Sequence, residues 1–171
     1  DKSGYFGGSP DEIRDHYRRH IHGIVHAMWD IEVPVVGAIN GPAIGLGGDV
    51  ASLCDIRIAA ASARFGATFL KVGLLPGDGG AWLLPRQIGW SRASQLFFTG
   101  DLIDAPTARE WGLVSEVVPD AELMSYCETL AKNPDSKALF YQFATIAEEG
   151  GKLKAVPYTV AYKEEMTAIS A

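Results

Sequence analysis

The chain has 171 residues, of which 47% are hydrophobic and 21% are charged, and its net charge at pH 7 is -6. This composition is typical of a globular protein that buries a core. Lysine and arginine form no stripe or run, which argues against binding to nucleic acid or an anionic membrane. Because no apolar run is long enough to cross a membrane and no secretion signal is visible, we expect a cytoplasmic protein that acts on small molecules.

The first predicted element is a helix that begins after Ser9 and ends near Asp30. The letters "SPDE" place serine at the N-cap, proline at the first helical position and glutamate three residues after the cap, which is a capping box. An apolar face then recurs at helical spacing, through Ile13, Tyr17, Ile21, Ile24, Val25, Met28 and Trp29.

All four histidines of the chain lie on this helix, as the pairs His16/His20 and His22/His26. The spacing within each pair is that of a metal site. However, the two pairs fall on opposite edges of the apolar face, and no carboxylate completes either pair. We therefore expect solvated histidines and no metal site.

A buried strand is predicted at 33–40, a helix at about 46–53 and another strand at 55–61. Strand, helix and strand in this order predict parallel pairing through a right-handed crossover. Later elements are three short helices and a strand, at about 81–87, 92–98, 106–111 and 113–118. From Asp120 onward, the sequence predicts only helices.

Two cysteines, Cys54 and Cys127, belong to no CxxC motif. Cys54 lies in an apolar stretch that reads as helix, where a buried, reduced thiol is the usual state. We expect no disulfide.

A glycine-rich stretch, "NGPAIGLGGDVASLCD", lies between the predicted strand and helix. A dinucleotide fingerprint would need a third glycine where Val50 stands, and a P-loop would need Lys after Gly48, where Asp49 stands. An aspartate in the first helical turn would also repel a bound phosphate. The amides at the helix start suit an enolate or oxyanion instead, with Asp49 as a base on the same ligand. Alternatively, Asp49 only complements the helix dipole.

A second stretch, "LLPGDGGAWLLPR", repeats the pattern of a glycine turn with an acid before a helix. Asp78 is the acid here. It is either an ordinary turn residue or a second acid in the same pocket, since the two turns could form two walls of one site.

These segments resemble the crotonase (enoyl-CoA hydratase/isomerase) superfamily. The resemblance runs from about Pro34 to Val118, through "PVVGAINGPAIGLGGDVASLCDIRIAAASARFG", "VGLLPGDGGAWLLPRQIG" and "TGDLIDAPTAREWGLVSEVV". It implies an α/β fold, a crotonase-like spiral of ββα turns at 1–119, followed by a C-terminal helical trimerisation region at 120–171. It also implies a homotrimer or hexamer.

In that family, two backbone amides hold the thioester oxygen of a coenzyme A substrate, and acidic side chains move protons. The resemblance places the Leu46 amide in this oxyanion hole and Asp49 at the position of the first catalytic glutamate, and Asp78 is the candidate for a second acid, although it matches no family position exactly. The implied acyl-CoA pocket is lined by Ala43, Ile44, Gly45, Phe69, Leu75, Pro76 and Gly77. No metal or redox cofactor is implied, since coenzyme A enters as part of the substrate.

Phe69 stands where hydratases have their second glutamate, and a phenyl ring cannot accept a proton. Dienoyl-CoA isomerases resemble the chain in having aspartate at the position of Asp49. Isomerases of phenylacetate breakdown have an aspartate one residue before Asp78. These comparisons favour a double-bond shift, with burial by Phe69 and Leu75 expected to raise the pKa of both aspartates. The alternatives are an enoyl-CoA hydratase and a degenerate binding or assembly protein.

The family's first oxyanion amide comes from an "FSAGGDL"-like segment that follows several strands. Nothing upstream of "DKSGYFGG" matches that segment. We therefore expect either part of a longer chain or a truncated paralogue, and an exposed sheet edge where those strands would pair.

Overall fold

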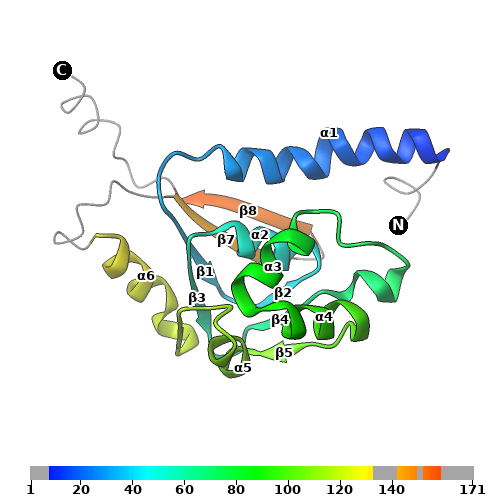
Figure 1. The fold of residues 1–171 in the computed structure, drawn as a ribbon. Coiled ribbons are helices and arrows are strands. Elements are labelled where there is room, and N and C mark those ends of the chain that lie inside the picture. The colour runs from blue at the N-terminus through cyan, green and yellow to red at the C-terminus, as the bar shows by residue number, and fades with distance from the viewer. Residues whose placement is uncertain (1–7, 133–141, 150–151, 159–171) are drawn as a thin grey trace, which may run out of the picture.

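A computed structural model describes residues 8–132, 142–149 and 152–158 of the chain (Figure 1). In chain order its elements are α1 (Pro10–Trp29), β1 (Val35–Ile39), β2 (Pro42–Ile44), α2 (Leu46–Leu53), β3 (Ile56–Ala60), β4 (Arg64–Gly66), the 3-10 helix η1 (Thr68–Val72), α3 (Gly80–Ile88), α4 (Trp90–Thr99), β5 (Ile103–Asp104), α5 (Ala105–Glu110), β6 (Glu116–Val118), the 3-10 helix η2 (Asp120–Glu122), α6 (Leu123–Ala131), β7 (Gln142–Glu149) and β8 (Lys152–Tyr158).

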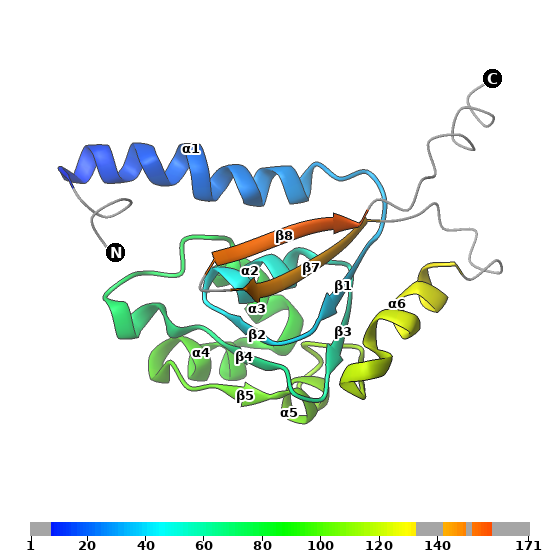
Figure 2. The same ribbon diagram turned by 180° about the vertical axis from the view of Figure 1, so that it is seen from behind.

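Helix α1 begins with the predicted capping box. The Ser9 hydroxyl accepts from the Glu12 amide at 3.3 Å, and the Glu12 carboxylate accepts from the Ser9 amide at 2.8 Å. The helix lies along one side of the molecule, next to α2 (Figures 1 and 2). None of its residues is buried, and two members of the predicted apolar face, Ile24 and Trp29, are exposed. The helix is therefore laid on the surface of the core rather than inserted into it.

The larger sheet has the strand order β6-β3-β1-β7-β8. Strand β1 pairs in parallel with β3, with Val36 opposite Ile56, and β3 pairs in parallel with β6. This confirms the predicted parallel topology, because the connection from β1 to β3 passes through α2. All five residues of β1 are buried, and α6 packs against β1 and β3.

A smaller sheet, in the order β2-β4-β5, was not predicted from the sequence. Its strands have only two or three residues each, too short for alternation of apolar and polar residues to identify them. Strand β2 leads directly into α2. The small sheet therefore supports the glycine turn that begins that helix.

The prediction of only helices after Asp120 is correct for α6 but wrong for β7 and β8. Strand β7 pairs in parallel with β1, and β8 pairs antiparallel with β7. Backbone N–H and C=O groups along the edge of β1 need hydrogen-bond partners, and β7 supplies them. The edge of β1 is consequently covered, contrary to the expected exposed edge.

The core has two parts. One lies between one face of the larger sheet, the small sheet and helices α2 to α5, and the other lies between the opposite face of the larger sheet and α6. Cys54 and Cys127 are both buried free thiols, which confirms the buried thiol predicted for Cys54, and Cys127 belongs to the second part of the core. In the ranges that the structure describes, no helix has the length and apolar character needed to cross a membrane.

Candidate active site

The turn between β2 and α2 depends on Gly45. Its φ of +57° lies in the left-handed region, which favours glycine. The Gly45 amide donates to the Gly66 carbonyl at 2.9 Å, which ties the turn to β4. Helix α2 then begins at Leu46 without a side-chain cap. The first amides of a helix have no intrahelical acceptor, and the oxyanion role predicted for the Leu46 N–H depends on this property.

Asp49 lies in the first turn of α2 and is only 1% exposed. The Gly80 amide donates a hydrogen bond to its carboxylate. Within the described residues, the other oxygen, Oδ2, has no hydrogen-bond partner. Burial raises the pKa of Asp49 to about 7, and the Gly80 hydrogen bond opposes this rise. Asp49 thus changes its charge close to neutral pH.

The two glycine stretches meet at Gly80. A Cβ atom added to this residue would lie 2.0 Å from Asp49 Oδ1, closer than any real contact, so only glycine fits here. This close approach lets the amide at the start of α3 reach a carboxylate on α2. The structure therefore brings the segment of Asp49 and the segment of Asp78 side by side.

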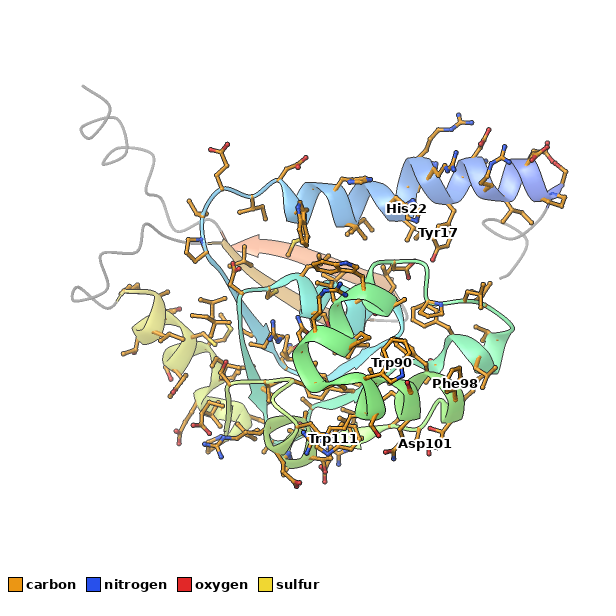
Figure 3. All side chains as sticks on the ribbon, in the orientation of Figure 1. Tyr17, His22, Trp90, Phe98, Asp101 and Trp111 are labelled. Carbon is orange, nitrogen blue, oxygen red and sulfur yellow. The ribbon has the colours of Figure 1, made fainter. Side chains whose placement is uncertain are left out.

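Asp78 lies two residues before Gly80 and is 2% exposed. Burial raises its pKa to about 6. The Tyr17 hydroxyl donates to Asp78 Oδ1. His22 Nε2 lies 3.0 Å from the Gly77 carbonyl oxygen, and the Tyr17 and His22 rings meet edge to face with centroids 5.2 Å apart. Figure 3 shows both side chains on the side of α1 that faces the loop leading to α3.

Tyr17 and His22 are not among the site residues predicted from the sequence. The sequence pattern indicated an apolar face for Tyr17 and a solvated helix edge for His22. One signal was available, because a tyrosine that packs against a protein surface usually finds a hydrogen-bond partner for its hydroxyl. The sequence could not identify that partner, since Asp78 is 61 residues away.

The other predicted pocket residues are spread over this region. Ala43 and Phe69 are buried, and the Phe69 ring lies 3.9 Å from where a Cβ on Gly45 would stand. Ile44, Gly45 and Pro76 are half-buried and Gly77 is exposed. Leu75 is 86% exposed, so the expectation that it helps to bury the aspartates is wrong. Gly80 lies against Asp49 instead, and Tyr17 against Asp78.

Metal-binding groups do not cluster in the described part of the chain, where no three His, Cys, Asp or Glu side chains lie close enough to hold an ion. The rings of His16 and His20 lie 5.6 Å apart, and those of His22 and His26 lie 6.5 Å apart. The expectation that no cofactor is needed stays a prediction. The titratable groups that this region brings together are two buried carboxylates with raised pKa values, Asp49 and Asp78.

Comparison with known proteins gives matches over most of the chain. Residues 5–150 match the family model of enoyl-CoA hydratase/isomerase. The chain is 38% identical over 134 residues to the 1,2-epoxyphenylacetyl-CoA isomerase of Escherichia coli (strain K12), covering 78% of this chain and 51% of the relative. It is 44% identical over 108 residues to the short-chain-enoyl-CoA hydratase of Clostridium acetobutylicum, covering 63% and 41%.

Solved structures agree with these matches. The crystal structure of an enoyl-CoA hydratase from Bacillus anthracis superposes with a TM-score of 0.67 at 37% identity, covering 77% of this chain and 51% of that one. A putative enoyl-CoA hydratase/isomerase from Mycobacterium abscessus gives a TM-score of 0.68 at 43% identity, covering 72% and 47%. The chain thus spans about half the length of the relatives that it matches.

Proposed function

Because the chain belongs to the enoyl-CoA hydratase/isomerase family, we propose that it acts on an unsaturated acyl-CoA thioester and shifts a double bond through an enolate. One observation carries this proposal. Two buried carboxylates, Asp49 and Asp78, adjoin the same glycine turn, and their pKa values are raised to about 7 and about 6. Groups with pKa values near the working pH are suited to removing and returning protons.

The difference between the two pKa values suggests separate roles. Near pH 7 Asp78 is mostly ionised, whereas Asp49 is about half protonated. We propose that Asp78 removes a proton from C2 of a 3-enoyl-CoA and that the C–H electrons move through the π-system onto the thioester oxygen. When the thioester carbonyl re-forms, C4 takes a proton from Asp49, which leaves the double bond between C2 and C3. Each aspartate then regains its starting charge by exchange with solvent.

The Leu46 amide is proposed to donate to the thioester oxygen while the enolate exists. A donor placed where negative charge develops lowers the barrier, and one such donor typically contributes a factor of about 10² to 10³ in rate. We place the second donor outside these 171 residues, together with most coenzyme A contacts. A homotrimer or hexamer in the cytoplasm, with no cofactor besides the coenzyme A of the substrate, completes the proposal.

An enoyl-CoA hydratase is the second candidate. The relative named short-chain-enoyl-CoA hydratase, at 44% identity, supports it. The buried Phe69 argues against it, because the two-carboxylate addition of water would need an acid at that position. In a hydratase, Asp49 and Asp78 would orient the water. A third possibility is a binding or assembly protein that holds acyl-CoA without turnover.

Separate incubations of the full-length protein with 3-enoyl-CoA and 2-enoyl-CoA distinguish these candidates. We expect the 3-enoyl substrate to become 2-enoyl-CoA, with little 3-hydroxyacyl-CoA formed from the 2-enoyl substrate. Hydration without isomerisation would favour the hydratase, and tight binding without turnover would favour the binding protein. Asp49→Asn and Asp78→Asn should each lose activity, whereas Glu110→Gln removes an exposed charge as a matched control. Near-wild-type rates in both aspartate variants would refute the assigned roles.

A further inference from the structure

We propose that Tyr17 is a positioning residue for Asp78, so that α1 belongs to the catalytic apparatus. The effect expected on turnover rests on the proposed function, but the contact between Tyr17 and Asp78 can be tested without measuring turnover. The Tyr17 hydroxyl donates to Asp78 Oδ1. This contact uses only one of the two carboxylate oxygens, Oδ1, and we assign the other, Oδ2, to the substrate proton.

The Tyr17 ring also lies on the backbone of the turn. A Cβ atom added to Gly77 would stand 3.4 Å from Tyr17 Cε1, an ordinary van der Waals contact, so the ring lies directly against this residue. His22 contacts the same residue, with Nε2 at 3.0 Å from the Gly77 carbonyl oxygen. Tyr17 and His22 of α1 therefore both contact the turn at Gly77 and Asp78, and this turn sets the position of the Asp78 carboxylate.

Packing alone does not explain this arrangement. None of the residues of α1 is buried, and its Trp29 meets Trp82 of α3 edge to face with ring centroids 5.8 Å apart, so apolar packing accounts for the C-terminal end of the helix but not for the polar contact of Tyr17. A tyrosine that only covered the surface could keep its hydroxyl in water. Here the hydroxyl meets a carboxylate that is 2% exposed, and hydrogen bonds to an ionised group are roughly twice as strong as neutral ones.

The contact has an electrostatic consequence. A hydroxyl that donates to a carboxylate stabilises its ionised form, which opposes the effect of burial. The other titratable groups that the structure shows at this turn are His22 from α1 and Asp49 from α2, which is hydrogen-bonded to Gly80. Removal of the Tyr17 hydroxyl should therefore raise the pKa of Asp78 and leave the orientation of its carboxylate less well fixed.

The test compares Tyr17→Phe with Tyr126→Phe, which removes a hydroxyl from an exposed tyrosine on α6. Carbon-13 NMR follows the aspartate carboxyl groups of the full-length protein from pH 4 to 9, with the Asp78 signal identified by its loss in Asp78→Asn. We expect the pKa of Asp78 to rise by about one pH unit in Tyr17→Phe and to stay unchanged in Tyr126→Phe.

Turnover gives a second measurement. In Tyr17→Phe, kcat should fall roughly tenfold with little change in KM, and the acidic limb of its pH profile should move upward with the pKa of Asp78. In the Asp78→Asn background, Tyr17→Phe should have no further effect on kcat, because the hydroxyl acts through that carboxylate.

An unchanged Asp78 titration in Tyr17→Phe would overturn the inference, and so would equal effects of Tyr17→Phe with and without Asp78. If Tyr17→Phe does not fold, Tyr17→Leu, which also lacks the hydroxyl, is titrated instead and should shift the pKa of Asp78 in the same direction. A wild-type protein that turns over neither enoyl-CoA refutes the proposed function alone, because the titration does not depend on activity.

Discussion

Replacement of Asp49 by asparagine should make the protein more stable at alkaline pH while it removes a proposed catalytic group. The pKa of Asp49 is about 7 in the folded protein, against 3.8 for an unperturbed aspartate. Between these two values the folded state binds more protons than the unfolded state, so the free energy of unfolding falls as the pH rises through this window. Above pH 7 the loss levels off, at roughly 4 kcal/mol for this one group.

Asparagine cannot ionise, so Asp49→Asn lacks this loss. The asparagine side-chain oxygen can still accept from the Gly80 amide. Its NH2 group replaces Oδ2, which has no hydrogen-bond partner among the described residues, and a buried donor left without an acceptor costs about 1–3 kcal/mol at every pH. The quantity to measure is therefore a difference between two conditions. From pH 5 to pH 8, the free energy of unfolding of Asp49→Asn should gain about 2.5 kcal/mol relative to wild type.

Urea unfolding at pH 5 and pH 8 measures this difference, with Glu110→Gln as the control for loss of one exposed carboxylate. The control should change little relative to wild type between the two conditions. If Asp49→Asn shifts stability by the same amount at both pH values, the carboxylate does not titrate near neutrality in the folded protein. The acid role proposed for Asp49 would then lose its physical basis.

Three further predictions concern the backbone around the site. Leu46→Pro removes the proposed oxyanion N–H at a first helical position that tolerates proline, so it should lower kcat by about 10² to 10³, whereas Leu46→Ala should stay near wild type. Gly80→Ala forces a methyl group to within 2.0 Å of Asp49 Oδ1, and thermal unfolding should show a loss of about 1–3 kcal/mol together with reduced turnover. Ser9→Ala breaks the capping box and should destabilise α1 by about 1 kcal/mol, visible as faster amide exchange in its first turn while the exchange of α2 is unchanged.

Much of the central fold could be predicted because its signals are local. The start of α1 is fixed by a serine, a proline and a glutamate within four residues, and α2 has the predicted bounds. The C-terminal strands could not be predicted in this way. Whether 142–149 forms a strand depends on an open edge of β1, more than 100 residues earlier, and that edge is a property of the assembled sheet.

The candidate site shows the same division. Asp49 and Asp78 could be proposed from sequence, because each is an acid in a glycine turn before a helix, within segments that resemble one enzyme family. Leu75 could not be judged, since an apolar residue in a turn gives no indication of the direction in which its side chain points, and it is 86% exposed. The contact of Tyr17 with Asp78 could not be predicted either, because it depends on how α1 lies over the turn.

Two opposing effects act on Asp49, and their balance decides its role. Its place in the first turn of α2 favours the ionised form, because the partial positive charge of the helix N-terminus is typically worth about 0.3–1 kcal/mol to an anion. Burial with one unpartnered oxygen favours the neutral form, and it outweighs the helix and the Gly80 amide together, since the pKa is raised to about 7. An aspartate that merely complemented the helix dipole would have a lowered pKa. The close approach of Gly80 thus keeps Asp49 buried and able to hold a proton, while Asp78, whose pKa burial raises only to about 6, is the stronger acid of the two.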